Sequence, residues 1–170
     1  MIILKKVCHN NWLDCIELEV EENQKQFVNP NIFSLAEAYV HSSINKKEAN
    51  EYYRCIPLAI YNDELLIGFT MITFEQEHDF DGGPAYEIYR LMIDKKYQKK
   101  GYGTEALNKI IEYIKTFPCG KAENIFAEWH PLNTVIESVC KKFGFEVVGR
   151  DEEDGAIISK FNIGIKGKRL

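Results

Sequence analysis

Three long apolar segments lie close together between residues 56 and 93, and they constrain the fold more than any other part of the chain. The segments "IPLAIY" (56–61) and "LLIGFTMITF" (65–74) are separated only by turn residues, a pattern typical of a β-hairpin. Both arms are apolar at nearly every position, which implies burial on both faces of a sheet. After an acidic loop, "AYEIYRLMI" (85–93) indicates a third long strand. The sequence therefore predicts a sheet covered on both sides.

The remaining segments predict helices and further strands around this hairpin. A helix is expected to begin at Ser34, a good N-cap with Glu37 three residues on, the capping-box pattern. From Thr104 to Phe117 apolar residues recur at helical spacing. Gly144 suits the left-handed end of another helix. The other expected elements are a strand over 2–7, helices over 10–23 and 134–143, and strands over 123–130, 145–150 and 156–163. This order, βααβββαβαββ, predicts an α/β protein with a mixed sheet.

Chain length and charge restrict the class of protein. The 170 residues fit one domain, which we expect over 1–165, with a basic tail over 166–170. No apolar run approaches the roughly 20 residues of a membrane span, and the N-terminus does not resemble a signal peptide. A net charge of −5 argues against nucleic-acid binding and suits a cationic small molecule.

Cysteine and histidine usage indicates reduced thiols and no metal. The five cysteines are widely scattered, odd in number and contain no C-x-x-C pair, so we expect a cytoplasmic protein. The four histidines include no H-E-x-x-H motif or other close pair. We therefore expect no metal site.

The stretch "YQKKGYGTEAL" (97–107) has the composition of an anion-binding loop. Gly101 and Gly103 permit close approach of a ligand to the backbone, and the helix that follows offers unpaired N–H groups. Lys99 and Lys100 add positive charge. The simpler alternative is a solvated connection in which the glycines serve only the turn.

The same stretch contains "GYGTEA" (101–106), which matches the G-x-G-x-x-G/A fingerprint of dinucleotide sites. In that fold the first glycine directly follows a strand, whereas here residues 94–100 intervene after Ile93. The unit also lies in the second half of a short chain, which leaves too little sequence for a doubly wound sheet. An NAD or FAD site is therefore disfavoured.

Two segments together resemble one known family. "RLMIDKKYQKKGYGTEAL" (90–107) is similar to the acetyl-CoA loop of the GNAT superfamily of N-acetyltransferases, with Gln98, Gly101 and Gly103 in its Q/R-x-x-G-x-G/A pattern. "NTVIESVCKKFGF" (133–145) resembles the family's N-x-x-A…G-F segment. Within the superfamily, the chain looks most like bacterial spermine/spermidine acetyltransferases.

The resemblance implies a single-domain, mostly antiparallel sheet of about seven strands with helices on both faces. It also implies acetyl-CoA as the acetyl donor, with its pyrophosphate on loop N–H groups, its pantetheine arm along the preceding strand, and an asparagine on the other side of the arm. The binding residues that it implies are Leu91, Met92, Ile93, Gln98, Lys99, Lys100, Gly101, Tyr102, Gly103, Thr104 and Asn133.

Direct acetyl transfer needs a base for the amine and a donor that polarises the thioester carbonyl. We expect a backbone N–H of the strand ending at Ile93 to polarise the carbonyl. Glu87 is the candidate base, because in a regular strand it shares a face with Tyr89, Leu91 and Ile93. The alternative is a surface glutamate at a sheet edge.

Direct transfer also needs an acid for the departing thiolate. Family members commonly carry a tyrosine seven residues after the asparagine, and this chain has Cys140 there. The reference pKa of a cysteine, about 8.5, would allow Cys140 to act as this acid, although a buried helical cysteine more often serves as a small hydrophobe. Tyr86, Tyr89 or solvent are the substitutes.

The acceptor is predicted from charge. The acidic residues within 75–81 and 17–22 could line a groove for a polyamine, although such charge runs are more often solvated faces. Arg90, if it faces the acceptor, would instead favour a substrate that carries a carboxylate.

The leading hypothesis is an N-acetyltransferase for a primary amine of a small polycation such as spermidine or spermine. The alternatives are acetylation of another small amine, such as an aminoglycoside or amino acid, and a CoA-binding sensor that has lost the chemistry. The expected partner is a small-molecule amine, with no nucleic acid and no membrane. Many members of the superfamily are dimers, so the resemblance also suggests a homodimer.

Overall fold

The computed structural model describes residues 1–43 and 53–164, so the predicted basic tail over 166–170 lies outside the described residues. The strands are β1 (Ile2–Lys6), β2 (Arg54–Asn62), β3 (Leu65–Glu75), β4 (Ala85–Ile93), β5 (Asn124–Trp129), β6 (Glu146–Arg150) and β7 (Ile157–Asn162). The helices are α1 (Trp12–Ile16), α2 (Asn31–Ser43), α3 (Tyr102–Ile114) and α4 (Thr134–Phe143), with short 3₁₀ turns η1 (Glu22–Gln24) and η2 (Lys95–Tyr97). This order of helices and strands confirms the predicted one.

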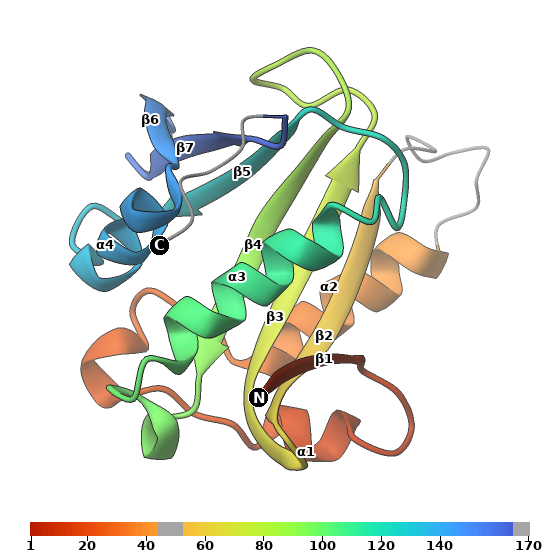
Figure 1. Ribbon diagram of the computed structural model, residues 1–170, viewed down its shortest axis with the longest axis vertical. Coiled ribbons are helices and arrows are strands. Elements are labelled where there is room, and N and C mark those ends of the chain that lie inside the picture. Colours follow the sequence, from red (N-terminus) through yellow and green to blue (C-terminus); the bar gives the residue numbers. More distant parts are fainter. Residues whose placement is uncertain (44–52, 165–170) are drawn as a thin grey trace.

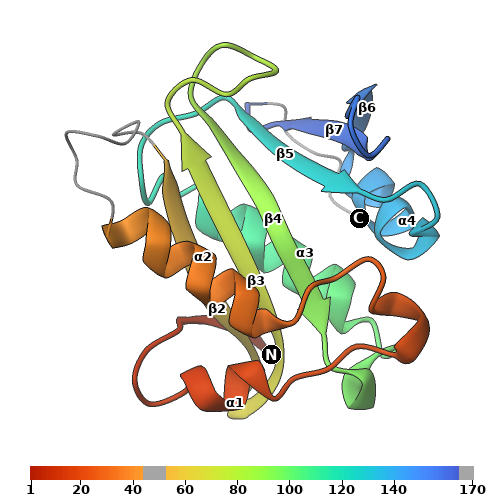
Figure 2. The ribbon, with the colours of Figure 1, turned by 180° about the vertical axis from the view of Figure 1, so that it is seen from behind.

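The strands form one seven-stranded sheet in the order β1-β2-β3-β4-β5-β7-β6. Every neighbouring pair is antiparallel except β4 and β5, which α3 connects as a parallel crossover. Helix α3 covers one face of the sheet, and α1 and α2 cover the other (Figures 1 and 2). The predicted mixed sheet with helices on both faces is confirmed.

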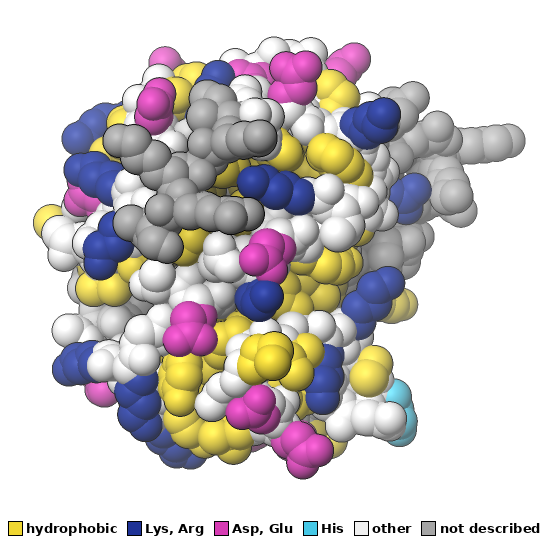
Figure 3. All heavy atoms as spheres, viewed as in Figure 1, with side chains coloured by type: hydrophobic (Ala, Val, Ile, Leu, Met, Phe, Trp, Pro, Cys, Tyr) yellow, Lys and Arg dark blue, Asp and Glu magenta, His cyan; other side chains and the backbone are white. Residues whose placement is uncertain are grey.

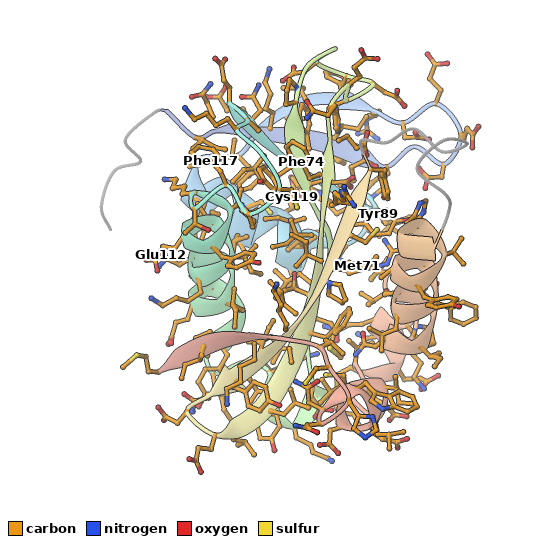
Figure 4. All side chains as sticks on the ribbon, turned by 90° about the vertical axis from the view of Figure 1, so that its right-hand side faces the viewer. Met71, Phe74, Tyr89, Glu112, Phe117 and Cys119 are labelled. Atoms are coloured by element: carbon orange, nitrogen blue, oxygen red, sulfur yellow. The ribbon has the colours of Figure 1, made fainter. Side chains whose placement is uncertain are left out.

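Each face of the sheet has its own core. The α3 face packs apolar residues of α3 and α4 on the sheet in the largest buried cluster. The α2 face packs α1 and α2 on β2, β3 and β4 in a second cluster that includes Phe69 and Met71. Figure 4 shows Met71 and Tyr89 on the α2 side and Phe74 on the side of α3. Burial on both sides explains the unbroken apolarity of β3.

Strands β4 and β5 pair over only three residues of each strand. The ladder joins Ala85, Tyr86 and Glu87 to Asn124, Ile125 and Phe126, and beyond it the strands diverge (Figure 1). Past Glu87, the edge of β4 that faces β5 therefore carries no strand partner in the described structure. A free strand edge of this kind can pair with an extended ligand.

A β-bulge in β4 changes which side chains share a face. The register with β3 shifts between Met71, opposite Arg90, and the next residue, opposite Ile88, so Tyr89 is the extra residue. The expectation that Glu87 shares a face with Leu91 and Ile93 is therefore wrong. Glu87 and Tyr89 lie on the α2 face, whereas Leu91 packs with the α3-face core.

Several helix boundaries also differ from prediction, including α3, which spans Tyr102–Ile114 and not 104–117, and two of the differences have a clear cause. Helix α1 ends at Ile16 rather than near residue 23, because the chain turns back and Val20 packs into the α2-face core. Helix α2 begins at Asn31, directly after Pro30, whose fixed φ and missing N–H suit a helix start. Ser34 thus lies inside the helix, 1% exposed, and is not its N-cap.

Candidate functional site

Two hollows meet where β4 and β5 diverge. The larger, about 300 Å³, runs past the loop before α3, the end of β4 and the start of α4. The smaller, about 110 Å³, lies between β4 and β5. Four residues line both hollows, which makes them one continuous cleft: Val28, Leu91, Asn133 and Ile136. We call the larger part the groove and the smaller part the reaction cavity.

The loop before α3 forms one end of the groove. Gly101 is the N-cap of α3 with φ of 84°, and Lys99 has φ of 62°, so both lie in the left-handed region. The amides of Tyr102 and Gly103, as the first helical residues, have no intrahelical acceptor and can bind an anion. The Thr104 amide, by contrast, already donates to the Gly101 carbonyl at 3.0 Å.

The two loop glycines serve different purposes. Gly101 needs a positive φ, which is strained for other residues. Gly103 has no positive φ, and an added Cβ would lie 3.9 Å from Ile93, an ordinary contact. Because the chain has room for a side chain there, Gly103 leaves open space in the groove.

Side chains anchor this loop to the end of β4. The Gln98 Nε2 donates to the Ile93 carbonyl at 2.9 Å and to Gln24 Oε1 at 2.7 Å. Buried Asp94 accepts from the amides of Lys96 and Glu19. The loop is thus held in shape before any ligand binds. In Figure 3, Lys and Arg side chains gather at the lower left, where Figure 1 shows η2.

Some acidic residues within 17–22 form contacts that hold the loop before α3 and its neighbouring turns in place, and they do not line an acceptor groove. Glu19 pairs with Lys95 at 2.6 Å, and Glu22 pairs with Lys25 at 2.7 Å. Glu21 forms a capping box with Gln24 in η1. None of the acidic residues in 17–22 lines the described cleft.

The other predicted cofactor residues lie around the groove, except Lys100, which does not line it and whose Nζ donates to the Lys96 carbonyl at 3.3 Å. Leu91, Met92 and Ile93 line it from β4, the strand with the free edge. Asn133 is the N-cap of α4, where its Oδ1 accepts from the Ile136 amide at 3.5 Å. Its side-chain NH₂ group is a donor at the junction of groove and reaction cavity.

Only some of the residues that line the reaction cavity were predicted from the sequence. Tyr89 and Cys140 were predicted, and both line it. Glu128, Trp129 and His130, which also line it, were not predicted. The signal available was their position in the strand that leads to Asn133, but a single sequence does not show that this strand parts from β4.

Two aromatic side chains close one side of the reaction cavity. The rings of Phe27 and His130 lie 5.3 Å apart between centroids and join the segment before α2 to the end of β5. His130 Nδ1 accepts from the Leu132 amide at 3.1 Å, so the neutral ring carries its proton on Nε2. The ring therefore presents a donor, which makes His130 a poor candidate base.

Cys140 also lines the reaction cavity. It is 1% exposed and packs in the α3-face core with Leu107 and Trp129. Burial raises the pKa of the Cys140 thiol to about 12. Its environment is that of a small apolar side chain.

Two tyrosines were considered as substitutes for the acid. Tyr86 is fully buried, and its hydroxyl donates to the Gly120 carbonyl at 2.8 Å and accepts from the Cys119 amide at 2.9 Å. It does not line the cleft, so the structure gives it a structural role. Tyr89 does line the reaction cavity, and burial raises the pKa of its phenol.

Carboxylates from three adjacent strands influence one another at the α2 face: Glu75 of β3, Glu87 of β4 and Glu128 of β5. Burial raises the pKa of Glu87 to about 8, and the charges of Glu128 and Glu75 contribute, while Arg90 opposes the shift. Glu87 is not in the cavity wall itself, but its neighbour Ile88 is. Opposite Glu87 on β3, fully buried Thr73 has a hydroxyl with no hydrogen-bond partner among the described residues.

The two outer carboxylates extend this acidic face. Burial raises the pKa of Glu75, with the nearby charge of Asp79 adding to the effect. Burial also raises the pKa of Glu128, and Asp151 and Asp154, from the turn between β6 and β7, add to it. Acidic side chains therefore follow one another from β3 to the β6–β7 turn.

Arg90 lines the reaction cavity but has partners of its own. Its guanidinium lies 4.0 Å from the Tyr89 ring centroid, and its Nη2 lies 3.9 Å from Glu37 Oε2 on α2. Its Nη1 donates to the Tyr89 carbonyl at 2.8 Å. Much of its charge is thus balanced by the protein, which weakens the case for a substrate with a carboxylate.

The described residues contain neither a metal-binding cluster nor a membrane-spanning helix. No group of three or more His, Cys, Asp or Glu side chains there could hold a metal ion. Within the same part of the chain, no helix has both the length and the apolar character of a membrane span.

Comparison with known proteins gives a consistent result. Residues 12–145 match the model of the acetyltransferase (GNAT) family. A probable spermine N(1)-acetyltransferase of Bacillus subtilis subsp. natto is 28% identical over 91% of this chain and 93% of its own. The spermine/spermidine N(1)-acetyltransferase of Bacillus subtilis is 27% identical over the same shares. The PaiA N-acetyltransferase of Thermoplasma acidophilum, solved with coenzyme A, has the same fold, with a TM-score of 0.61, 21% identity and coverage of 95% of this chain and 99% of its own.

Proposed function

Because the chain belongs to the GNAT acetyltransferase family, we propose that it transfers an acetyl group from acetyl-CoA to a primary amine of a polyamine such as spermidine or spermine. The observation that carries this proposal is the cleft, which joins the glycine loop before α3 at one end to a cavity lined by Glu128 at the other, on a sheet face that also carries Glu75 and Glu87.

The groove suits the donor substrate. The free amides at the start of α3, with Lys99 and Lys100, would hold the pyrophosphate, and the open space at Gly103 lets it approach. The free edge of β4 at Leu91–Ile93 would pair with the amide-containing pantetheine arm, and Asn133 would contact it from α4. When bound, acetyl-CoA supplies an activated acetyl group next to the reaction cavity.

The residues of the cavity supply the remaining chemistry. A β4 backbone N–H near the bulge at Tyr89 polarises the carbonyl. Glu87 accepts the proton of the amine through a water, and its raised pKa matches that task near neutral pH. Glu128 is close enough to influence Glu87 and lines the cavity itself, so it positions the ammonium form of the acceptor.

The acceptor is inferred from the acidic face and the relatives. Glu75, Glu87 and Glu128 stand on three neighbouring strands, with Glu75 opposite Ala85 and Glu128 two residues beyond the last β4–β5 pair. A flexible polyamine carries several ammonium groups, which could pair with carboxylates spread over a face in this way. Burial raises the pKa of all three carboxylates, and Arg90 offsets this only in part at Glu87, so the ammonium groups of a polycation would stabilise their charged forms. The two Bacillus relatives are named for spermine or spermidine acetylation.

Release of free thiol from acetyl-CoA tests the proposal. Purified protein is assayed with spermidine, spermine, propylamine, an aminoglycoside and amino acids, against a no-amine control. Activity that requires spermidine or spermine supports the proposal, and activity only with other amines contradicts the acceptor. CoA binding without turnover on any amine would indicate a sensor, and failure to bind CoA would contradict the whole function.

A set of matched variants locates the acceptor. We expect Glu128→Gln and Glu75→Gln each to raise the KM for spermidine about tenfold, or about 1.4 kcal/mol, with a smaller effect on propylamine. Glu77→Gln, at an exposed glutamate two residues beyond the end of β3, is the control and should leave KM unchanged. A homodimer and a cytoplasmic location stay predictions, and light scattering and cell fractionation test them.

A further inference from the structure

Trp129 lines the reaction cavity and carries a buried N–H group that no other described residue contacts by a hydrogen bond. The side chain stands at the end of β5, is 5% exposed and packs in the α3-face core. Its Nε1 has no hydrogen-bond partner among residues 1–43 and 53–164. Buried polar groups in native proteins nearly always have partners, so this donor requires an acceptor that the described chain does not supply. A ligand in the cavity can supply one.

Cys140, the residue at the position of the family's tyrosine, lies in the same wall. Both side chains line the reaction cavity and belong to one core cluster. A cysteine fills much less space than a tyrosine, and the large indole of Trp129 packs in the same region. The indole N–H is a donor only, so it can stabilise negative charge without competing as a proton acceptor.

We propose that the Trp129 indole N–H donates a hydrogen bond to the sulfur of coenzyme A as the thioester bond breaks. The inference rests on the proposed acetyl transfer. The amine nitrogen forms the new C–N bond, and the C–S bond breaks with its electron pair going to sulfur. The indole keeps its proton throughout. The amine proton passes through water to Glu87 and then to solvent, and solvent protonates the released thiolate.

Indole NMR of the ¹⁵N-labelled protein tests the contact directly. The chain has two tryptophans, so two indole N–H signals are expected, and Trp12→Phe assigns them. When unacetylated coenzyme A is bound, the indole N–H signal of Trp129 should move downfield as the thiol of coenzyme A ionises, over about pH 7 to 10. The indole N–H signal of Trp12 should stay fixed.

Acetyl-CoA is the control ligand, because it occupies the same groove without an ionisable thiol. It separates ionisation of the CoA thiol from that of cavity residues such as Glu128, His130, Tyr89 and Cys140, and from the fixed charge of Arg90. If the Trp129 signal responds to pH in the same way with both ligands, the inference is wrong. Calorimetric titration measures CoA binding separately: if CoA binds without changing the Trp129 signal, the inference is wrong, and if CoA does not bind, the proposed function fails first.

A pair of variants gives a second, independent measurement. Trp129→Phe should lower kcat about tenfold and change the Kd for CoA less than about twofold, whereas Trp12→Phe changes neither. In Trp129→Phe the thiol of bound CoA should ionise at higher pH, followed by ultraviolet absorption of the thiolate. Unchanged thiol ionisation in a folded Trp129→Phe variant would overturn the inference, even if kcat fell through altered packing.

Discussion

Glu87 and Cys140 lie on opposite faces of the sheet, at the point where β4 and β5 part. Glu87 belongs to the α2 face with its neighbouring carboxylates, and Cys140 belongs to the apolar core of the α3 face. A reacting group held between the strands would therefore meet an acidic, proton-accepting side and an apolar side. This arrangement gives each side chain a distinct and testable role.

The pH dependence of activity should follow Glu87. Its folded pKa of about 8 means that the carboxylate becomes an effective base only as the pH rises through that value. We expect kcat/KM to rise with pH, with a midpoint near 8. In Glu87→Gln this rise should be absent, and kcat/KM should be at least about a hundredfold lower than in the wild type. A pH–rate profile of Glu87→Gln that matches the wild type would assign the base elsewhere, with Glu128→Gln the next variant to measure.

The same carboxyl group should make stability depend on pH. Below the ordinary value of 4.5 both the folded and the unfolded chain hold the proton, and between 4.5 and about 8 only the folded chain does. Stability from this group is therefore lost as the pH rises through that window. We expect Glu87→Gln to exceed the wild type in free energy of unfolding by about 2 kcal/mol near pH 9 and to match it near pH 4. Urea unfolding at both pH values measures the difference, and Glu77→Gln should show none.

Cys140 should prove dispensable for the chemistry. Because burial keeps its thiol protonated to about pH 12, we expect Cys140→Ala to retain kcat within about threefold. The lost sulfur leaves a small cavity that lowers the free energy of unfolding by about 1 kcal/mol. Cys140→Tyr, which restores the family's residue, should overfill the wall beside Trp129 and cost about 1–3 kcal/mol. A large loss of kcat in a stable Cys140→Ala protein would return the thiol to the mechanism.

The two loop glycines should separate stability from ligand binding. Gly101→Ala forces a side chain into a left-handed conformation and should cost about 1 kcal/mol. Gly103→Ala adds a good helix former with room for its Cβ and should stabilise the chain by up to about 1 kcal/mol. The same Cβ enters the groove, so CoA affinity should fall. Thermal unfolding and calorimetric titration with CoA measure the two effects, and normal CoA affinity in Gly103→Ala would contradict the placement of the ligand.

Gln98 should act as an anchor of the loop. Gln98→Ala removes the hydrogen bonds to the Ile93 carbonyl and to Gln24, and the loop amides lose their fixed orientation. We expect about 1–2 kcal/mol lower stability and about tenfold weaker CoA binding. Gln76→Ala, at an exposed glutamine, is the control for both measurements. Equal CoA affinity in the two variants would argue against the anchor.

The sequence predicted helices and strands well where the apolar pattern was long and its ends were marked by nearby residues. β4 has the predicted bounds, 85–93, and α4 has the predicted bounds, 134–143, with Gly144 in the left-handed conformation. In both segments a sustained apolar pattern and a clear breaker set the ends. The start of α2 was misplaced because Ser34 and Glu37 imitate a capping box inside a helix that Pro30 had already begun.

The site was harder to predict because it depends on how strands meet. The bulge at Tyr89 is a property of the register between β4 and β3, and it moved Leu91 to the face opposite Glu87. Glu128 escaped notice because nothing in its own strand shows that β5 parts from β4 after Phe126. The loop at 97–107 was recognisable because its chemistry is contained in consecutive residues.

The short ladder between β4 and β5 also has a mechanical consequence. The ladder between the first four strands and the unit formed by β5, β6 and β7 has only three residues on each strand, and α3 is the covalent link. A ligand that pairs with the free edge of β4 and also contacts α4 would act as a cross-brace between the two halves. Ligand binding should therefore slow local unfolding of β5, β6 and β7 more than local unfolding of β2 and β3. Amide hydrogen exchange rates, measured strand by strand with and without ligand, test this difference.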